Sequence, residues 1–290
     1  MYKNRRVVVC IPCGREKYLR VLMPYLLSPR ATIVDEIQLW VNTDVQQDLD
    51  YLEFLAMRFG PKVKRVIAQE PLRKEVYDAS RNHVQFNSSV NRFYRFTVQP
   101  KTIYVKMDDD ICYVHPDFFY NACEDLLQKE NSVAFVMTNV FNIPMTTKIN
   151  QDRGVLDTKM GKSDGIPRCP LACLSGPFAK HLHDQFLELY KKNELKKLYF
   201  DSLNLSGHQR IGVMLWTGER FAGFGGNVGQ SDEKFITQEL PVKFGLPVRL
   251  IGNALVSHFA FSHQRAELED KSDILEQYLK IAVDETGFVL

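Results

Sequence analysis

Strand-like and helix-like segments alternate over the first 107 residues, and this alternation constrains the fold more than any other feature of the sequence. Continuous apolar, β-branched runs, typical of strands buried on both faces, are followed by segments whose apolar residues recur at helical spacing. This order predicts an α/β fold with a doubly wound, mostly parallel, Rossmann-like central sheet and helices on both of its faces. The expected strands are 6–11, 36–41, 63–68 and 102–107, and the expected helices are 18–27, 48–59 and 78–87.

The remainder of the chain continues as α/β structure with more irregular segments. Turn signals rich in Gly and Pro recur over residues 142–170, for which we expect a long loop. No internal repeat is present, so we expect a single domain over residues 1–290. The other expected elements are helices at 117–129, 186–198, 232–239 and 266–283, and strands at 133–140, 248–251 and 254–261.

The charge balance argues against two classes of protein. The 290 residues include 37 Lys and Arg against 35 Asp and Glu, a formal net charge of +2. A protein that attracts nucleic acid through its overall field would be strongly basic, and a solvating chain would be strongly acidic. No apolar run reaches the length of about 18 residues that predicts a membrane span, and no signal peptide is visible at the N-terminus. We therefore expect a cytoplasmic protein without a transmembrane segment.

The six cysteines include one C-x-x-C pair, Cys10 and Cys13, at the first expected strand. Together with Cys169 and Cys173 this pair would supply four ligands for a zinc site. Residues three apart in a strand point to opposite faces, so the geometry argues against a shared ion. We favour reduced and mostly buried thiols.

The strand expected at 102–107 leads directly into three carboxylates, Asp108, Asp109 and Asp110. Ligands of doubly wound sheets bind at the carboxyl ends of the strands, which is where these acids lie. Strand alternation directs Asp108 and Asp110 to one side and Asp109 to the other. Two carboxylates on one side can share Mg²⁺ or Mn²⁺ with a diphosphate supplied by a substrate. The alternative is a surface turn rich in aspartate.

A hydrophobic strand entering Asp108, preceded by the turn after the first strand and by Asp44 after the second, resembles the GT-A class of nucleotide-sugar-dependent glycosyltransferases. The resemblance extends from Val7 to about Phe261. It implies an enzyme that uses Mn²⁺ or Mg²⁺ and a UDP- or GDP-sugar, and that transfers the sugar to a hydroxyl group of a glycan or similar acceptor. The implied parts of the domain are a donor half at 1–115, an acceptor and catalytic half at 116–265, and a C-terminal helix at 266–290.

The resemblance assigns the donor nucleotide to the turn after the first strand and to the acid after the second. Gly14 lets the backbone approach a ligand closely, and Asp44 can accept a hydrogen bond from a base or a ribose hydroxyl. Arg81 and Arg73 are candidates for binding the diphosphate because a guanidinium matches phosphate oxygens, and we favour Arg81 over Arg73. The alternatives are a tight turn, a helix N-cap and a surface ion pair. The implied donor-binding residues are Pro12, Cys13, Gly14, Arg15, Asp44, Arg81 and Asp109.

An acidic pair, Asp232 and Glu233, follows the glycine-rich segment 223–229 and resembles the catalytic-base segment of inverting members of the class. There one carboxylate takes the proton of the acceptor hydroxyl while that hydroxyl attacks the sugar. We choose Asp232 as the base over Glu233. The alternative is that Ser231 and both acids only cap a helix.

A late histidine is the third candidate. Several members of the class bring such a residue to the metal, and His258, which ends an apolar segment, matches this position better than His263. The implied metal ligands are then Asp108, Asp110 and His258. The alternative is a histidine whose hydrogen bonds are satisfied within the core.

Three other functions remain open. A retaining GT-A enzyme would share every donor-site residue named above. A nucleotidyltransferase also binds Mg²⁺ through carboxylates, but it favours a Gly-rich basic loop after the first strand, and Pro12–Arg15 has a single Gly. A non-catalytic glycan-binding module is disfavoured by the presence of Asp108, Asp110 and Asp232. The aromatic residues near the glycine-rich segment, Trp216, Phe221 and Phe224, either pack in the core or cover a donor sugar.

Overall fold

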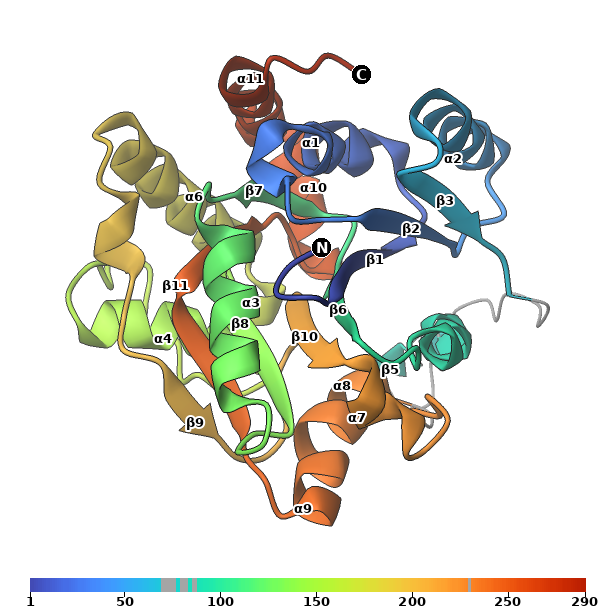
Figure 1. The fold of residues 1–290 in the computed structure, drawn as a ribbon. Coiled ribbons are helices and arrows are strands. Elements are labelled where there is room, and N and C mark those ends of the chain that lie inside the picture. Colours follow the sequence, from blue (N-terminus) through green and yellow to red (C-terminus); the bar gives the residue numbers. More distant parts are fainter. Residues whose placement is uncertain (69–76, 79–82, 85–87, 229–230) are drawn as a thin grey trace.

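A curled mixed β-sheet forms the centre of the computed structural model, which describes residues 1–68, 77–78, 83–84, 88–228 and 231–290 (Figure 1). Within these residues the sheet has nine strands in the order β3–β2–β1–β6–β10–β8–β11–β7, and β9 pairs with β11. Strands β1, β2, β3, β6, β8 and β11 run in one direction, and β7, β9 and β10 run in the other. The prediction of a mostly parallel sheet is thus confirmed. The strands are β1 Arg6–Cys13, β2 Glu36–Val41, β3 Val63–Val66, β6 Thr102–Met107, β7 Ile111–Val114, β8 Phe135–Phe141, β9 Leu203–Leu205, β10 Val213–Thr217 and β11 Val248–His258.

Helices cover both faces of this sheet, and β1 shows how the sequence separates the two faces. Its residues alternate between two apolar cores: Val9 and Cys13 belong to one, and Val8 and Cys10 to the other. Cys10 and Cys13 therefore point to opposite faces, as predicted, and the described cysteines are free and buried. The helices that pack in the first core are α1 Glu16–Leu27, α2 Gln46–Phe59, α3 Phe118–Lys129, α6 Gly176–Lys191 and α11 Ile274–Thr286. Those in the second core are η2 Ser88–Phe96, α7 Gly218–Ala222, η4 Phe235–Glu239 and α9 Leu240–Phe244.

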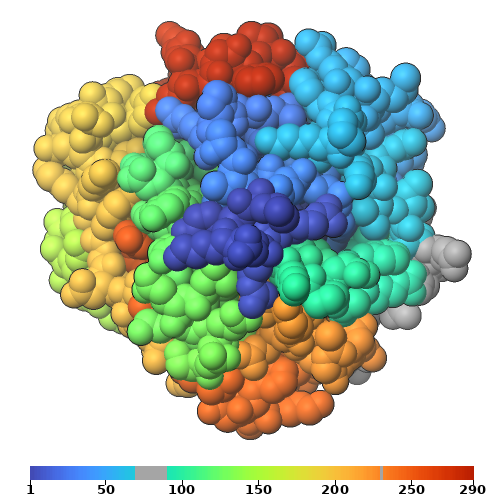
Figure 2. All heavy atoms as spheres, in the orientation of Figure 1, coloured from blue at the N-terminus to red at the C-terminus, as the bar shows by residue number. Residues whose placement is uncertain are grey.

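The aromatic residues near the glycine-rich segment belong to the second core. Trp216 and Phe221 are fully buried and stack with their ring centres 4.5 Å apart. Phe224 is partly buried against the same cluster, and Tyr94 from η2 packs on Trp216. These rings form core, which is the first of the two predicted alternatives. Figure 2 shows α11 at one end of the molecule and the 210–245 segment at the other, with the N-terminal residues between them. No helix in the described part of the chain is both long and apolar enough to cross a membrane.

Two predicted segments differ from the structure. Most of the helix expected at 78–87 lies outside the described residues, and the described residues there form β4 Tyr77–Asp78 and β5 His83–Val84, which pair antiparallel. The loop expected at 142–170 contains α4 Pro144–Asp152, and α5 Pro170–Leu174 begins at its last residue. Both of these helices begin at a proline, which lacks an N–H group that the first helical turn does not need. Proline thus starts helices in a segment where it was interpreted as a sign of turns.

Several element boundaries also differ from the predictions. The helix expected at 186–198 is α6, which begins ten residues earlier behind the N-cap Ser175, and a short η3 Leu195–Leu198 follows it. The helix that begins at α8 Asp232–Lys234 continues through η4 and α9, so Pro241 lies inside it. The two strands expected after residue 248 are the single strand β11, whose pairing with β8 shifts register between Ile251 and Leu255. The C-terminal helix is divided into α10 Arg265–Asp270 and α11, and the remaining short helices are η1 Pro29–Ala31 and η5 Ser262–Gln264.

Strand β1 is longer than predicted because it continues through Pro12 and Cys13. Both residues pair with β2, opposite Trp40 and Val41, whereas the pairing of β1 with β6 ends at Cys10. Pro12 therefore lies where one side of the strand has no partner strand, and a missing N–H group is tolerated there. The turn that was expected to begin at Pro12 begins at Gly14.

Candidate active site

The three consecutive aspartates form a tight turn between β6 and β7. The Asp108 N–H group donates to the carbonyl of Gly212, which precedes β10, at 3.0 Å. The Phe259 N–H group, directly after β11, donates to the Asp110 carbonyl at 2.8 Å. These two backbone hydrogen bonds, to the residue before β10 and the residue after β11, give the turn a defined position at the carboxyl end of β6.

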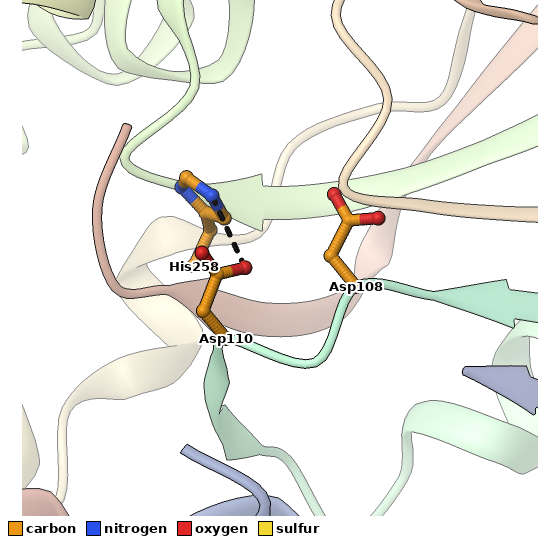
Figure 3. Close-up of side chains that lie close together, drawn as sticks. All are labelled: Asp108, Asp110 and His258. Carbon is orange, nitrogen blue, oxygen red and sulfur yellow. Dashed lines mark ion pairs between the residues drawn. The ribbon is translucent and has the colours of Figure 1, made fainter. Parts of the chain in front are cut away.

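The turn and the end of β11 bring together the three predicted metal ligands, Asp108, Asp110 and His258. Figure 3 shows both carboxylates projecting from the turn, with His258 beside Asp110. One donor atom from each residue can be chosen so that all three lie within 4.8 Å of one another. The His258 Nε2 atom is 3.5 Å from Asp110 Oδ1, and its Nδ1 atom is buried without a hydrogen-bond partner among the described residues. Two carboxylates and an imidazole are ligands that Mn²⁺ and Mg²⁺ accept, so the residues fit such an ion.

Electrostatics favour the metal-binding form at His258 and Asp110, whereas burial opposes it at Asp108. Burial lowers the pKa of His258, although Asp110 opposes the shift, and a neutral imidazole is the ligating form. Burial opposes ionisation of Asp110, but Arg15 and Arg265 outweigh it and lower the pKa of that carboxyl. Burial raises the pKa of Asp108, against the effect of Lys106.

The middle aspartate contacts the turn after β1. Asp109 Oδ2 accepts hydrogen bonds from the Gly14 N–H group at 3.1 Å and from Arg15 Nε at 3.2 Å. Arg15 also reaches Asp110, with Nη1 at 3.0 Å from Oδ2. Three of the predicted donor contacts, Gly14, Arg15 and Asp109, are therefore engaged with one another. A Cβ atom on Gly14 would lie 3.3 Å from the Asn42 carbonyl oxygen, so the close approach at this glycine is to the chain itself.

The acidic turn is surrounded by cations of the chain. Lys106 is 5% exposed and forms an ion pair with Asp108. Arg265, at the start of α10, lies 3.6 Å from Asp110 Oδ2. With the Arg15 contacts, each of the three carboxylates has a cationic partner within the described structure. The turn is therefore close to electroneutral before it binds any ligand.

The second acidic pair begins α8, with Ser231 as its N-cap, as predicted. The two acids have different partners. Asp232 Oδ2 accepts a hydrogen bond of 2.8 Å from the Tyr94 hydroxyl. Glu233 forms an ion pair with Arg210 at 2.8 Å, and burial raises the pKa of Glu233 while Arg210 opposes it.

Two consecutive backbone groups join this helix start to the acidic turn. The Ile211 N–H group donates to Glu233 Oε1 at 3.2 Å, and the next residue, Gly212, accepts from the Asp108 N–H group. The two acidic groups are more than 120 residues apart in the sequence, yet they meet at this one segment. The fold therefore brings them close together.

Two other predicted site residues lie at the surface, and the two candidate arginines lie outside the described residues. Asp44 is exposed in the loop before α2, and Val45 rather than Asp44 is the N-cap of that helix. His263 is exposed in η5. Arg73 and Arg81 lie outside the described residues.

Four residues of the site were missed in the sequence. Lys106 could have been noticed, because a lysine interrupts an otherwise apolar strand. Tyr94, Arg210 and Arg265 could not, because their partners are brought near only by the fold.

Comparisons with known proteins show a likeness of fold. No protein-family model and no curated protein sequence matches the chain. A crystal structure of GalNAc-T7 with UDP, GalNAc and Mn²⁺ superposes with a TM-score of 0.53 at 11% identity, covering 98% of this chain and 48% of that one. The chain thus spans about half the length of this neighbour.

Two further solved structures superpose less well. A 4-diphosphocytidyl-2C-methyl-D-erythritol synthase has a TM-score of 0.44 at 12% identity, with 95% and 99% of the two chains covered. TarS 1-349 of S. aureus has a TM-score of 0.45 at 8% identity, with 98% and 66% covered. At such identities the likeness concerns the fold, and of these three only the GalNAc-T7 score exceeds 0.5. The chain therefore has an α/β fold, with a large, curled, mostly parallel mixed sheet, similar to that of GT-A glycosyltransferases.

Proposed function

We propose that the chain is a metal-dependent glycosyltransferase that moves a sugar from a UDP- or GDP-sugar to a hydroxyl group of a glycan or similar acceptor, with inversion at the sugar. The observation that carries the proposal is the convergence of Asp108, Asp110 and His258 at the carboxyl end of β6, with donor atoms within 4.8 Å of one another. The fold likeness to GalNAc-T7 supports it, because that protein was solved with UDP, GalNAc and Mn²⁺.

Asp108, Asp110 and His258 are the residues that would hold Mn²⁺ or Mg²⁺. The ion, when bound, supplies a Lewis acid that neutralises the charge of the leaving diphosphate. The chain's own part is to keep the two carboxylates and the imidazole in place, and the backbone bonds of the turn to Gly212 and Phe259 serve this purpose.

Asp232 is the proposed general base. It receives the proton of the acceptor hydroxyl while the acceptor oxygen bonds to the anomeric carbon and the bond from that carbon to the diphosphate breaks. The Tyr94 hydroxyl orients the Asp232 carboxylate. Glu233 is already engaged by Arg210 and the Ile211 N–H group, which favours Asp232 over Glu233 as the base.

The donor nucleotide is assigned to residues 1–115, with Pro12, Cys13, Asp44 and Arg81 as proposed contacts. Gly14, Arg15 and Asp109 support the site indirectly, because their mutual contacts shape the turn on which the metal ligands lie. Residues 116–265 are the proposed acceptor and catalytic half, and 266–290 the C-terminal segment.

A screen of nucleotide sugars with Mn²⁺ tests the proposal. The preferred donor should raise the unfolding temperature, because a ligand that binds only the folded state stabilises it by RT ln(1 + [L]/Kd). That donor is then incubated with candidate acceptors, and the released nucleotide and the anomeric configuration of the product are determined by chromatography and NMR. Nucleoside diphosphate with an inverted product supports the proposal. Release of pyrophosphate would indicate a nucleotidyltransferase instead. A product that keeps the configuration of the donor sugar would indicate a retaining enzyme. Absence of donor binding would contradict the proposal.

A further inference from the structure

Lys106 is a buried cation beside the acidic turn. It is the second-last residue of β6, a strand whose residues are all buried, and it is 5% exposed. An ammonium removed from water is costly unless an anion compensates it. The anion is Asp108, which forms an ion pair with Lys106.

The same Asp108 carboxylate is one of the three candidate metal ligands. The Lys106 ammonium and a divalent ion are both drawn to its oxygen atoms, and they repel each other at short range. Asp108 therefore cannot serve both cations equally well. Binding of the ion requires the ammonium to move or to share the carboxylate.

The second acidic group lies on the same side of β6 as Lys106. Lys106 is two residues from Tyr104 and shares its face of the strand, and Tyr104 belongs to the second core together with Tyr94, whose hydroxyl donates to Asp232. The proximity has a structural basis in the Ile211–Gly212 segment, whose backbone bonds to both Glu233 and Asp108. The two groups are thus within the electrostatic reach of one ammonium.

Of the two acids in this second group, Asp232 is the one able to receive the ammonium. Glu233 already pairs with Arg210. Asp232 has the Tyr94 hydroxyl as a hydrogen-bond donor, but among the described residues no cation forms an ion pair with it.

We propose that Lys106 is a positioning residue that couples the candidate metal site to the candidate base: its ammonium leaves Asp108 when that carboxylate binds a divalent ion, and pairs with Asp232 instead. The inference rests on the proposed function for the roles of Asp108 and Asp232. Its consequence is that Asp232, which accepts from the Tyr94 hydroxyl and the Glu233 N–H group, gains a cationic partner only when the ion is in place.

A double-mutant cycle tests the coupling without any turnover. Mn²⁺ alone, at pH 8 and without nucleotide, is titrated into the wild type, Lys106→Met, Asp232→Asn and the double variant by calorimetry and by EPR of free Mn²⁺. Lys106→Met should bind Mn²⁺ about tenfold more tightly, because a competing cation is gone, a size usual for coupled sites. Asp232→Asn should bind Mn²⁺ about tenfold more weakly, although Asp232 is not a ligand, because the displaced Lys106 ammonium then has no carboxylate at position 232 with which to pair.

The double variant decides between coupling and a simple field effect. If Lys106 carries the coupling, Asp232→Asn changes Mn²⁺ affinity by less than about twofold in the Lys106→Met background. If Asp232 acts on the ion directly through its charge, the loss is the same in both backgrounds and the inference is overturned. It is also overturned if Lys106→Met does not tighten Mn²⁺ binding.

Controls separate this effect from loss of charge or of folding. Lys106→Arg keeps a cation and should keep the coupling. Lys234→Met removes a half-exposed ammonium from the same helix start, where it pairs with Glu239, and should leave Mn²⁺ affinity within about twofold. Lys106→Gln replaces Lys106→Met if circular dichroism shows that the latter is unfolded. Absence of Mn²⁺ binding in the folded wild type would contradict the proposed function itself, whereas binding with additive effects of the two substitutions would contradict this inference alone.

Discussion

The hydroxyl group of Tyr94 donates a hydrogen bond of 2.8 Å to Asp232, across 138 residues of sequence. Tyr94 is fully buried in the second core, between Trp40 and Trp216, so its ring has little freedom to move. Burial raises the pKa of Tyr94 well above its ordinary value, with Asp232 adding to the shift, and the group therefore remains a donor. Asp232 is oriented by a rigid element of the core, which a general base requires.

Removal of this hydroxyl should lower the rate of transfer more than donor affinity. Tyr94→Phe loses one hydrogen bond to a carboxylate, and we expect kcat to fall about tenfold while the KM for the donor changes little. Steady-state kinetics measure the split. Tyr104→Phe is the matched control, because Tyr104 is buried in the same aromatic cluster and its hydroxyl bonds to the backbone of Gln99. Equal rate losses in the two variants would show that Tyr94 acts only through packing.

Asp232→Asn should reduce transfer by roughly 10²–10⁴-fold, the contribution usual for a general base, with donor binding close to that of the wild type. Glu233→Gln should cost much less in rate, because Glu233 faces Arg210 and Ile211 rather than Tyr94. Single-turnover assays and calorimetric donor binding distinguish the two steps. A dead Glu233→Gln variant beside an active Asp232→Asn variant would place the base one residue later.

The acidic turn shows where sequence-based reasoning about stability is insufficient. Three adjacent carboxylates suggest mutual repulsion, from which a gain in stability on removing one would follow. In the structure Lys106 and Arg15 compensate this repulsion, and both depend on the carboxylates for their own burial. The sign of the expected change is therefore reversed.

Asp108→Ala should abolish Mn²⁺ binding and also lower the free energy of unfolding in EDTA by about 1–3 kcal/mol, because Lys106 loses the ion pair that compensates its burial in the metal-free structure. Urea denaturation followed by circular dichroism gives this difference. Adding Lys106→Met to Asp108→Ala should recover most of the stability and none of the Mn²⁺ binding. A single variant as stable as the wild type would show that water or another acid compensates Lys106.

The parts of the fold that could be predicted are those specified by local pattern. Strands β1 and β6 were identified because strands buried on both faces leave continuous apolar runs. The starts of α4 and α5 were missed because Pro144 and Pro170 have two meanings in a sequence, a break or a first helical position, and only the surrounding structure decides between them.

The site divides in the same way. Asp108 and Asp110 could be proposed because they follow the buried strand β6, and His258 because the resemblance to GT-A enzymes implies a late histidine at the metal. The cations that balance these acids could not be predicted. Arg15 lies after β1 and Arg265 at the start of α10, and their distances to Asp110 depend on the packing of the whole sheet. Tyr94 lies in the 3-10 helix Ser88–Phe96, and its contact with Asp232, 138 residues later, depends on the folded chain.

His183 is fully buried in α6 between the Tyr278 hydroxyl, 2.9 Å from Nδ1, and the Phe259 carbonyl, 2.7 Å from Nε2. Burial lowers its pKa from 6.5 to about 4, although the bond to Phe259 opposes the shift. Between these two values the unfolded chain binds more protons than the folded one, so stability falls as the pH is lowered. This histidine alone should contribute a loss of about 3 kcal/mol between pH 7 and pH 4. Urea denaturation at several pH values should therefore show a shallower dependence for His183→Gln than for the wild type. The exposed His263 provides the control, since His263→Gln should leave the dependence unchanged. If His183→Gln and the wild type lost stability in parallel, His183 would not be the group that takes up the proton.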